Sequence, residues 1–270
     1  MTPENFRYIQ CQMKQRTAIV LPDDKQYMVE SRLEKLARAH VFANVDQLIE
    51  ESRKRGARSE LQTAVIESLI IHETFFFRDP AFAQVSRQLL TRLIEQNRRS
   101  RQLRIWSAAC STGQEPYSLA IILRENFPEL ADWSVEIIAS DISHSALDKA
   151  RAGRYSMMEV NRGLPTTLLM RHFKQQGLDW QAAEPLRRAI TFKQINLVER
   201  WPDMPTFDLV LLRNVLIYLD DRSRQEVIRR VTRVLRPEGY LVLGASETRE
   251  SQGALIPTPE FKGVPCYQRE

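Results

Sequence analysis

The sequence predicts an α/β protein: a doubly wound, Rossmann-like domain that follows an N-terminal all-α domain and contains a small inserted antiparallel β-subdomain. From residue 104 onward, short apolar strands alternate with helical segments, which implies parallel pairing through right-handed crossovers. Residues 1–71 show helical periodicity and no convincing strand. Between residues 153 and 189 the alternation is lost over a stretch too long for a simple crossover, which indicates the insertion.

Three domain assignments follow from this pattern. Residues 1–72 form the predicted helical domain, residues 73–270 form the α/β domain, and the inserted subdomain occupies about residues 154–188. A chain of 270 residues with 43% hydrophobic content is long enough to bury cores of this size.

A basic ridge is expected on the helix predicted over residues 24–40. Arg32, Lys35 and Arg38 recur at every third position and so share one face, beside an apolar face that includes Leu33. Lysine and arginine usually lie on solvated faces. The alternative is a surface that docks an acidic partner, and the residues alone leave both interpretations open.

Further helix starts are indicated by capping residues. Asp46 is predicted to cap one helix, and Ser59 begins a capping-box pattern that opens another. Asp79, followed by Pro80, predicts a helix that runs to the polar stretch at residues 96–100.

The α/β domain is expected to alternate strands and helices in chain order. Strands are predicted at residues 104–108, 134–140, 189–194, 207–213 and 240–244, with a last strand at 264–269. Helices are predicted at residues 116–126, 143–152 and 222–235. In the insertion, a short helix is predicted at residues 166–173 and a turn at 177–179.

The loop between the first strand and the first helix of this domain is a predicted ligand site, because open α/β sheets bind ligands at such loops. The loop holds one glycine, Gly113, whereas phosphate-binding loops need several. Glu115 stands at the helix start, where a carboxylate repels pyrophosphate and attracts an ammonium group. The loop therefore indicates a cofactor with positive charge, unless Glu115 is merely a first-turn residue beside Pro116.

Polar residues also follow the next strands. Asp141 closes the second strand, where an acid is placed to bind ribose hydroxyls; its alternative role is to cap the following helix, although Ser143 is the better cap. Asn196 and Leu197 end the third strand, where an amide and an apolar residue suit an adenine edge. Tyr218 follows the fourth strand, either over the reaction centre or packed with its hydroxyl at the surface.

Arg78 stands directly after three consecutive phenylalanines at residues 75–77. A guanidinium beside an aromatic cluster offers a planar fork that fits a carboxylate. Arg78 is therefore a candidate site residue at the expected domain junction.

Composition and cysteine usage limit the class of protein. The sequence shows no apolar run long enough to span a membrane and no signal-peptide pattern, so a cytoplasmic protein without membrane insertion is expected. The three cysteines are far apart and the four histidines form no ligand pair, which argues against disulfides and against a metal site. The net charge of +5 admits nucleic acid, an acidic protein surface or an anionic membrane as partner.

Six segments taken together resemble one known family in order and spacing. They are IHETFFFRD, AACSTGQEPYSLA, IIASDIS, FKQINL, RNVLIY and GYLVLGASE. The family is that of the chemotaxis receptor methyltransferases (CheR), and the resemblance covers nearly the whole chain. It implies methyl transfer from S-adenosylmethionine to glutamate side chains of methyl-accepting chemoreceptors, which gives glutamate methyl esters and S-adenosylhomocysteine, without a metal.

The resemblance also implies roles for individual residues. The positions that match cofactor-contacting residues of the family are Thr74, Arg78, Glu115, Asp141, Asn196, Leu197, Asn214 and Val215. His72 is assigned to the same set, although it stands where we expect asparagine. Arg78 and Tyr218 are the predicted catalytic residues.

The implied partners are the cytoplasmic domains of chemoreceptors. Arg32, Lys35 and Arg38 match the basic helix that faces the receptor in this family, which now favours the docking interpretation. Residues 174–186 are shorter than the ribbon with which some members grip a receptor's C-terminal pentapeptide, so such tethering is not expected. A monomer is expected, and control by a regulatory adaptor is left open.

The sequence disfavours two alternative functions and gives limited support to a third. A nucleic-acid methyltransferase is disfavoured because no Asn-Pro-Pro-Tyr-like pocket follows the fourth strand. An NAD-dependent dehydrogenase is disfavoured by the glycine-poor loop and by Glu115. A non-catalytic regulator of the same fold, which binds the cofactor without turnover, has His72 as its only support in the sequence.

Overall fold

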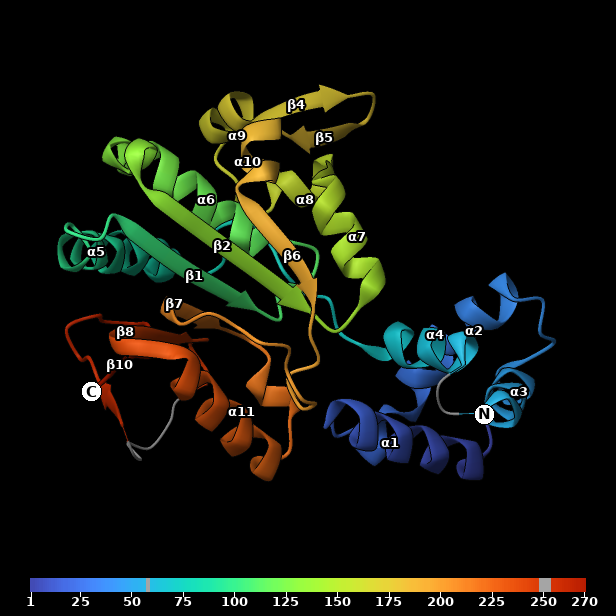
Figure 1. Cartoon of the computed structure of the whole chain (residues 1–270). Helices are drawn as coiled ribbons and strands as arrows, with labels where there is room; N and C mark the ends of the chain where they lie inside the picture. Colours follow the sequence, from blue (N-terminus) through green and yellow to red (C-terminus); the bar gives the residue numbers. More distant parts are fainter. Residues whose placement is uncertain (57–58, 248–253) are drawn as a thin grey trace. The chain divides into compact units, whose positions relative to one another are not determined.

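The computed structural model describes residues 1–56, 59–247 and 254–270. They divide into two compact units. Figure 1 colours the chain by residue number. The helical unit comprises Met1–Ile71 and Tyr218–Arg224, and the sheet unit comprises His72–Ile217 and Gln225–Glu270. Within the described ranges, none of the helices combines the length and the apolar character that crossing a membrane requires.

Four α-helices build the described part of the helical unit before residue 72. They are α1 (Pro3–Thr17), α2 (Gln26–Ala39), α3 (Val45–Arg55) and α4 (Glu60–Leu69), and a 3-10 turn, η1 (Asp23–Lys25), precedes α2. Their apolar faces meet in a core that includes the fully buried Ile9, Leu33 and Leu48. Ser59 caps α4 as predicted, because its hydroxyl accepts a hydrogen bond from the Gln62 backbone N–H at 3.2 Å.

The start of α3 differs from the prediction. Asn44, not Asp46, is the N-cap, and its side chain accepts a hydrogen bond from the Gln47 N–H at 2.9 Å. The Asp46 carboxylate instead accepts hydrogen bonds from the Thr2 N–H at 2.8 Å and the Asn5 amide at 2.7 Å. A first-turn carboxylate still suits the helix dipole, so Asp46 is free to join α3 to α1.

The main sheet of the sheet unit has the strand order β6-β2-β1-β7-β8-β10-β9 among the described residues. The strands are β1 (Gln102–Ala108), β2 (Ser134–Asp141), β6 (Ile190–Gln194), β7 (Phe207–Leu212), β8 (Leu235–Leu243), β9 (Leu255–Pro257) and β10 (Cys266–Arg269). The first five pair in parallel, and β10 pairs antiparallel with β8 and β9. The short β9 was not predicted, because three residues show no readable alternation.

Helices accompany the strands along the chain. They are α5 (Pro80–Gln96), α6 (Gln114–Asn126), η2 (Pro128–Asp132), α7 (His144–Ala152), η3 (Leu216–Tyr218) and α11 (Asp221–Val234). Figure 1 shows α6 and α7 beside β2 and β6, and these elements are in contact. Leu209 and Leu211 of the buried β7 face the core that contains α5 and α6. Burial along the whole strand is typical of a parallel strand covered on both faces.

The order of the strands reverses at β1. From β1 the chain adds β2 and then β6 on one side, and it returns to add β7 and β8 on the other. The carboxyl ends of β1 and β7 therefore lie next to each other at the point where open α/β sheets bind their ligands.

The insertion forms a second, three-stranded antiparallel sheet in the order β3-β5-β4. Its elements are β3 (Arg154–Ser156), α8 (Met157–Asn161), α9 (Thr166–His172), β4 (Phe173–Gln176), β5 (Asp179–Ala182) and α10 (Glu184–Arg188). The fully buried Phe76 packs edge-on against Tyr155 and Phe173, with ring centroids 5.0 and 5.5 Å away. The predicted fold class, including the all-α domain and the antiparallel insertion, is confirmed.

We expect the native chain to expose one reactive thiol. Cys11 is exposed, whereas Cys110 and Cys266 are buried. Burial raises the pKa of the Cys110 thiol well above its ordinary value and that of Cys266 to about 12. At pH 8, a thiol-specific chromogenic reagent should therefore titrate about one thiol per native chain, and about three after denaturation. Rapid native reaction of more than one thiol would contradict this burial.

Candidate functional site

The loop between β1 and α6 holds Glu115 at the carboxyl end of β1. Glu115 lies in the first turn of α6, and its side chain is 14% exposed. One of its carboxylate oxygens accepts a hydrogen bond from Ser107 Oγ at 2.7 Å. The loop turns at Gly113, where φ is +95° and a Cβ would lie 2.8 Å from Ala150 Cβ. Only glycine fits this turn, which explains the single glycine of the loop.

Asp141 joins the end of β2 to the same loop. Its two carboxylate oxygens accept hydrogen bonds from the backbone N–H of Ser111 at 2.8 Å and of Ser143 at 3.0 Å. Ser143 itself caps α7, as predicted. Burial raises the pKa of the Asp141 carboxyl, and the two backbone donors oppose that shift. Its role toward a ribose stays a prediction.

Asn196 and Leu197 lie two and three residues after the end of β6, at the same edge of the sheet. The Asn196 side-chain oxygen accepts a hydrogen bond from the Val198 N–H at 3.2 Å. Leu197 is buried, and its carbonyl accepts a hydrogen bond from the Trp201 indole at 3.1 Å. The amide and the apolar side chain are thus held in a defined turn, and their contact with adenine stays a prediction.

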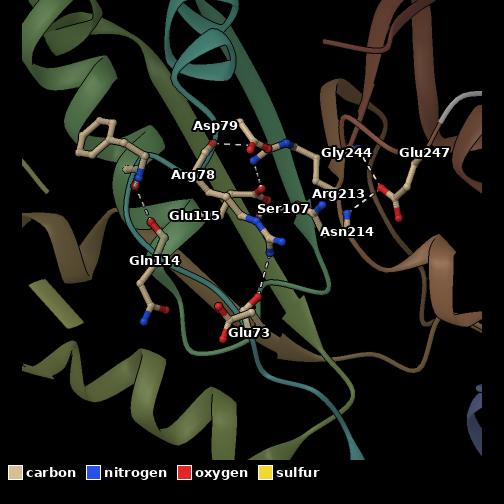
Figure 2. Close-up of polar contacts among 12 residues, drawn as sticks. Glu73, Arg78, Asp79, Ser107, Gln114, Glu115, Arg213, Asn214, Gly244 and Glu247 are labelled. Carbon is tan, nitrogen blue, oxygen red and sulfur yellow. Dashed lines mark hydrogen bonds and ion pairs between the residues drawn. The ribbon is translucent and has the colours of Figure 1, made fainter. Parts of the chain in front are cut away.

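The turn after β7 contains Asn214 and Val215 and is organised by Glu247. The Glu247 carboxylate accepts hydrogen bonds from four backbone N–H groups, those of Asn214 (2.6 Å), Leu216 (2.7 Å), Ile217 (3.3 Å) and Gly244 (2.8 Å). Asn214 has a φ of +59°, a conformation that non-glycine residues adopt only where the surroundings support it. Figure 2 shows Glu247 beside Asn214 and Gly244.

His72, Thr74 and Arg78 lie on the segment that leads into α5. The His72 carbonyl accepts a hydrogen bond from Ser111 Oγ at 3.2 Å, which ties this segment to the β1–α6 loop. Thr74 and Arg78 are half-buried, and Arg78 Nη1 donates to the Glu73 carbonyl at 2.9 Å. The segment thus borders the edge of the sheet that carries the other predicted residues.

Arg213 lies at the centre of this site and is not among the site residues predicted from the sequence. Its guanidinium donates to Glu115 (Nη1–Oε2, 2.8 Å) and to Asp79 (Nη2–Oδ2, 2.7 Å), as Figure 2 shows. Nη2 also reaches the Arg78 carbonyl at 3.2 Å. Asp79 occupies the predicted N-cap position, but it makes no capping hydrogen bond because its carboxylate is paired with Arg213. One signal in the sequence could have pointed to Arg213, because it directly follows the apolar run of β7. Arginine is seldom fully buried unless it is paired, so an arginine at that place predicts an acidic partner.

Tyr218 groups with the helical unit and not with the sheet unit. It ends η3, and its carbonyl accepts a hydrogen bond from the Val20 N–H at 3.1 Å. The structure thus does not bring it together with the other predicted site residues within one unit, and its catalytic role stays a prediction.

Comparison with known families decides the identity of the site. Residues 72–258 match the family described as CheR methyltransferase, SAM binding domain, and residues 4–69 match the CheR methyltransferase all-alpha domain. The chain belongs to the CheR methyltransferase family. S-adenosylmethionine is therefore its cofactor, and the chain is a methyltransferase of chemotaxis.

Similar proteins cover nearly the full length. The chemotaxis protein methyltransferase 1 of Pseudomonas aeruginosa is 37% identical over 249 residues, which are 90% of this chain and 89% of that protein. A chemotaxis protein methyltransferase of Vibrio parahaemolyticus is 34% identical over 271 residues, which are 98% and 95% of the two chains. The resemblance noted in the sequence is thereby confirmed. In the part of the CheR chain that the structure describes, no group of three or more His, Cys, Asp or Glu residues is placed to hold a metal ion.

We expect Glu247→Gln to weaken cofactor binding in this CheR protein. The glutamine keeps one acceptor oxygen but points an amide at N–H donors, so the turn at Asn214 loses hydrogen bonds to a charged acceptor. The free energy of unfolding should fall by about 2–3 kcal/mol, and the Kd for S-adenosylhomocysteine should rise about tenfold. Urea denaturation and calorimetry measure the two effects. Glu129→Gln, at an exposed residue of η2, is the control; equal behaviour of both variants would show that Glu247 does not organise the turn.

Proposed function

We propose that this CheR methyltransferase is a protein-glutamate O-methyltransferase that acts on chemoreceptors. In this proposal it converts glutamate side chains of the receptors' cytoplasmic domains to methyl esters, with S-adenosylhomocysteine as the second product. The names of the curated relatives, which are chemotaxis protein methyltransferases, support the pathway. The proposal places the protein in the cytoplasm, where these receptor domains lie.

The observation that carries the proposal is the charge of the site at the carboxyl ends of β1 and β7. Two carboxylates, Glu115 and Asp79, share the single guanidinium of Arg213. In this cluster two acidic side chains contact one guanidinium, at the edge of the sheet where the strand order reverses. S-adenosylmethionine carries an ammonium and a sulfonium group, so a site rich in acceptor carboxylates fits this cofactor and does not fit a pyrophosphate.

Named residues would hold the cofactor in this proposal. Glu115 would accept hydrogen bonds from its ammonium group, and Asp141 would accept them from its ribose. Asn196 and Leu197 would contact its adenine. Further contacts are proposed for His72, Thr74, Asn214 and Val215. When bound, S-adenosylmethionine supplies an already activated methyl group.

The reaction places modest chemical demands on the protein. A glutamate substrate is ionised at pH 7, since its unperturbed pKa lies near 4.3, so no general base is required. The protein must instead align the attacking oxygen and hold the carboxylate without quenching it. We assign to the Arg78 guanidinium the orientation of a carboxylate, either that of the substrate or the cofactor's own, with assistance from Tyr218.

Methyl transfer to native receptors tests the proposal directly. Purified protein and radiolabelled S-adenosylmethionine are incubated with membranes that contain the chemoreceptors of the source cell. Label on a receptor-sized band that is released by base as methanol is the expected result, because carboxyl methyl esters are base-labile. Base-stable label would exclude the ester. Cofactor binding without any transfer to receptors with free glutamates would favour the non-catalytic regulator.

The docking surface is proposed on α2. Lys35 and Arg38 are exposed there, whereas Arg32 is half-buried and its guanidinium donates to the Leu69 and Ile70 carbonyls at 2.9 and 3.3 Å. Arg32 therefore also stabilises the junction of α2 with α4. Lys35 and Arg38 are the members of the ridge that face solvent, and Arg38 also pairs with the exposed Glu34 at 3.5 Å.

Charge reversal on α2 should weaken receptor recognition without affecting the cofactor. We expect the double variant Lys35→Glu/Arg38→Glu to raise KM for receptor about tenfold or more at low salt, because opposite charges steer the encounter. The Kd for S-adenosylhomocysteine should stay unchanged.

A matched control exists on α3. Arg38 pairs with Glu34 and Arg55 with Glu51, both at a spacing of four residues, and Lys54 and Arg55 are exposed. Lys54→Glu/Arg55→Glu thus makes the same charge change on α3 instead of α2. If both double variants raise KM equally, net charge and not the α2 ridge governs docking.

A further inference from the structure

We propose that Arg213 is a positioning residue that sets both the carboxylate of Glu115 and the turn that carries Arg78. This inference rests on the proposed function, in which Glu115 binds the cofactor and Arg78 orients a carboxylate. Arg213 directly follows β7, whereas the two groups that it holds come from α6 and from the segment before α5. A single side chain thus joins three parts of the sheet unit (Figure 2).

The first contact fixes the orientation of Glu115. Ser107 Oγ donates to one carboxylate oxygen at 2.7 Å, and Arg213 Nη1 donates to the other at 2.8 Å. With both oxygens bonded, the plane of the carboxylate is defined before any ligand binds. A carboxylate held in this way pays little conformational entropy when it receives an ammonium group.

The second contact holds a strained turn. Phe77 and Asp79 both have positive φ values, 50° and 64°, so Arg78 lies between two non-glycine residues in the left-handed region. Such a pair persists only where the surroundings hold it. The Phe77 N–H donates to Ser118 Oγ at 2.9 Å, and Arg213 Nη2 bonds the Arg78 carbonyl and the Asp79 carboxylate. Arg213 thus supports the backbone of Arg78.

The surroundings of Arg213 suit a rigid support. Its side chain is 2% exposed, and its guanidinium lies 3.8 Å from the centroid of the Phe82 ring. Low solvent exposure strengthens its charge-assisted hydrogen bonds. Lysine carries the same charge but lacks the planar fork that reaches two carboxylates at once, so it is expected to replace arginine only in part.

The test separates positioning from general stability. We expect Arg213→Gln to raise the Kd for S-adenosylhomocysteine about tenfold and to lower kcat about tenfold, and Arg213→Lys to recover part of each loss. Because the effect on affinity acts through Glu115, Arg213→Gln should change Kd less than about threefold in a Glu115→Gln background. Equal changes of Kd in both backgrounds would overturn the proposal, as would wild-type affinity and turnover in a folded Arg213→Gln.

Two further variants complete the experiment. Arg92 pairs with Glu260 at 2.7 Å and lies over the Phe261 ring at 4.7 Å, so Arg92→Gln removes a paired arginine at an exposed position, with both constants expected to be unchanged. If Arg213→Gln does not fold, Asp79→Asn tests the turn alone, with a fall in kcat of about fivefold and little change in Kd expected. Unchanged kcat in Asp79→Asn would then overturn the proposal. Failure of the wild type to methylate receptors would instead count against the proposed function.

Discussion

Arg78→Ala is expected to lower kcat for receptor methylation about 100-fold or more, because a positioned guanidinium supplies alignment that water does not replace. The Arg78 guanidinium bonds the Glu73 carbonyl and lies 5.5 Å from the centroid of the Phe75 ring, so it is held at a defined place. Single-turnover methyl transfer measures the chemical step, and calorimetry with S-adenosylhomocysteine shows whether the cofactor's own carboxylate is the group that Arg78 orients.

Arg162 offers a close control for this experiment. Its guanidinium lies over the same Phe75 ring at 4.5 Å and pairs with the Glu73 side chain. Arg162→Ala removes an arginine from the same aromatic neighbour without touching the group assigned to the carboxylate, and we expect less than a threefold change in kcat. If Arg78→Ala leaves both cofactor affinity and turnover intact, the catalytic assignment is wrong.

Gly163→Ala is expected to cause a larger loss of stability than the same substitution at Gly177. Gly163 has a φ of +91°, and a Cβ there would lie 2.0 Å from the Phe76 carbonyl oxygen. Because the obstacle is backbone, relief requires movement of the segment that leads to Arg78. We expect the free energy of unfolding to fall by about 3 kcal/mol or more, as measured by urea denaturation.

Gly177→Ala measures the cost of the left-handed backbone conformation in the absence of a steric clash. Gly177 has a φ of +65° in the turn between β4 and β5, and a Cβ there meets nothing within 4 Å. Its substitution should cost only the left-handed conformation, about 1–2 kcal/mol. Should Gly163→Ala cost no more than Gly177→Ala, the contact with Phe76 would not constrain the insertion.

Regular elements were predictable from sequence because their signals are local. The apolar runs of β1, β2 and β7 and the caps at Ser59 and Ser143 carry their own information within a few residues. The cap of α3 was missed for a different reason. Asn44 and Asp46 are both good capping residues, and the hydrogen bonds from Thr2 and Asn5 that occupy Asp46 come from a distant helix.

The residues of the candidate site differ in the same way: those with a local signal could be predicted, and those defined by long-range partners could not. Glu115 and Asp141 could be singled out because each follows a readable strand. Arg213 could not be paired with Asp79 from sequence, since 134 residues separate them and the pairing depends on β7 lying beside β1. Glu247 likewise acts on a turn that lies 33 residues earlier in the chain. Electrostatic partners that the topology brings together leave no periodic trace in a sequence.

The large sequence separation of Glu247 and Arg213 from their hydrogen-bond partners has a consequence for biosynthesis. On the ribosome, the β1–α6 loop with Glu115 emerges well before its guanidinium partner, and the turn after β7 emerges before the carboxylate that gathers its N–H groups. A nascent chain that ends before residue 247 therefore lacks the carboxylate that organises the turn after β7. Because domains fold as units, cofactor capture should begin only after residue 247 has been translated, and S-adenosylmethionine should not assist earlier stages of folding.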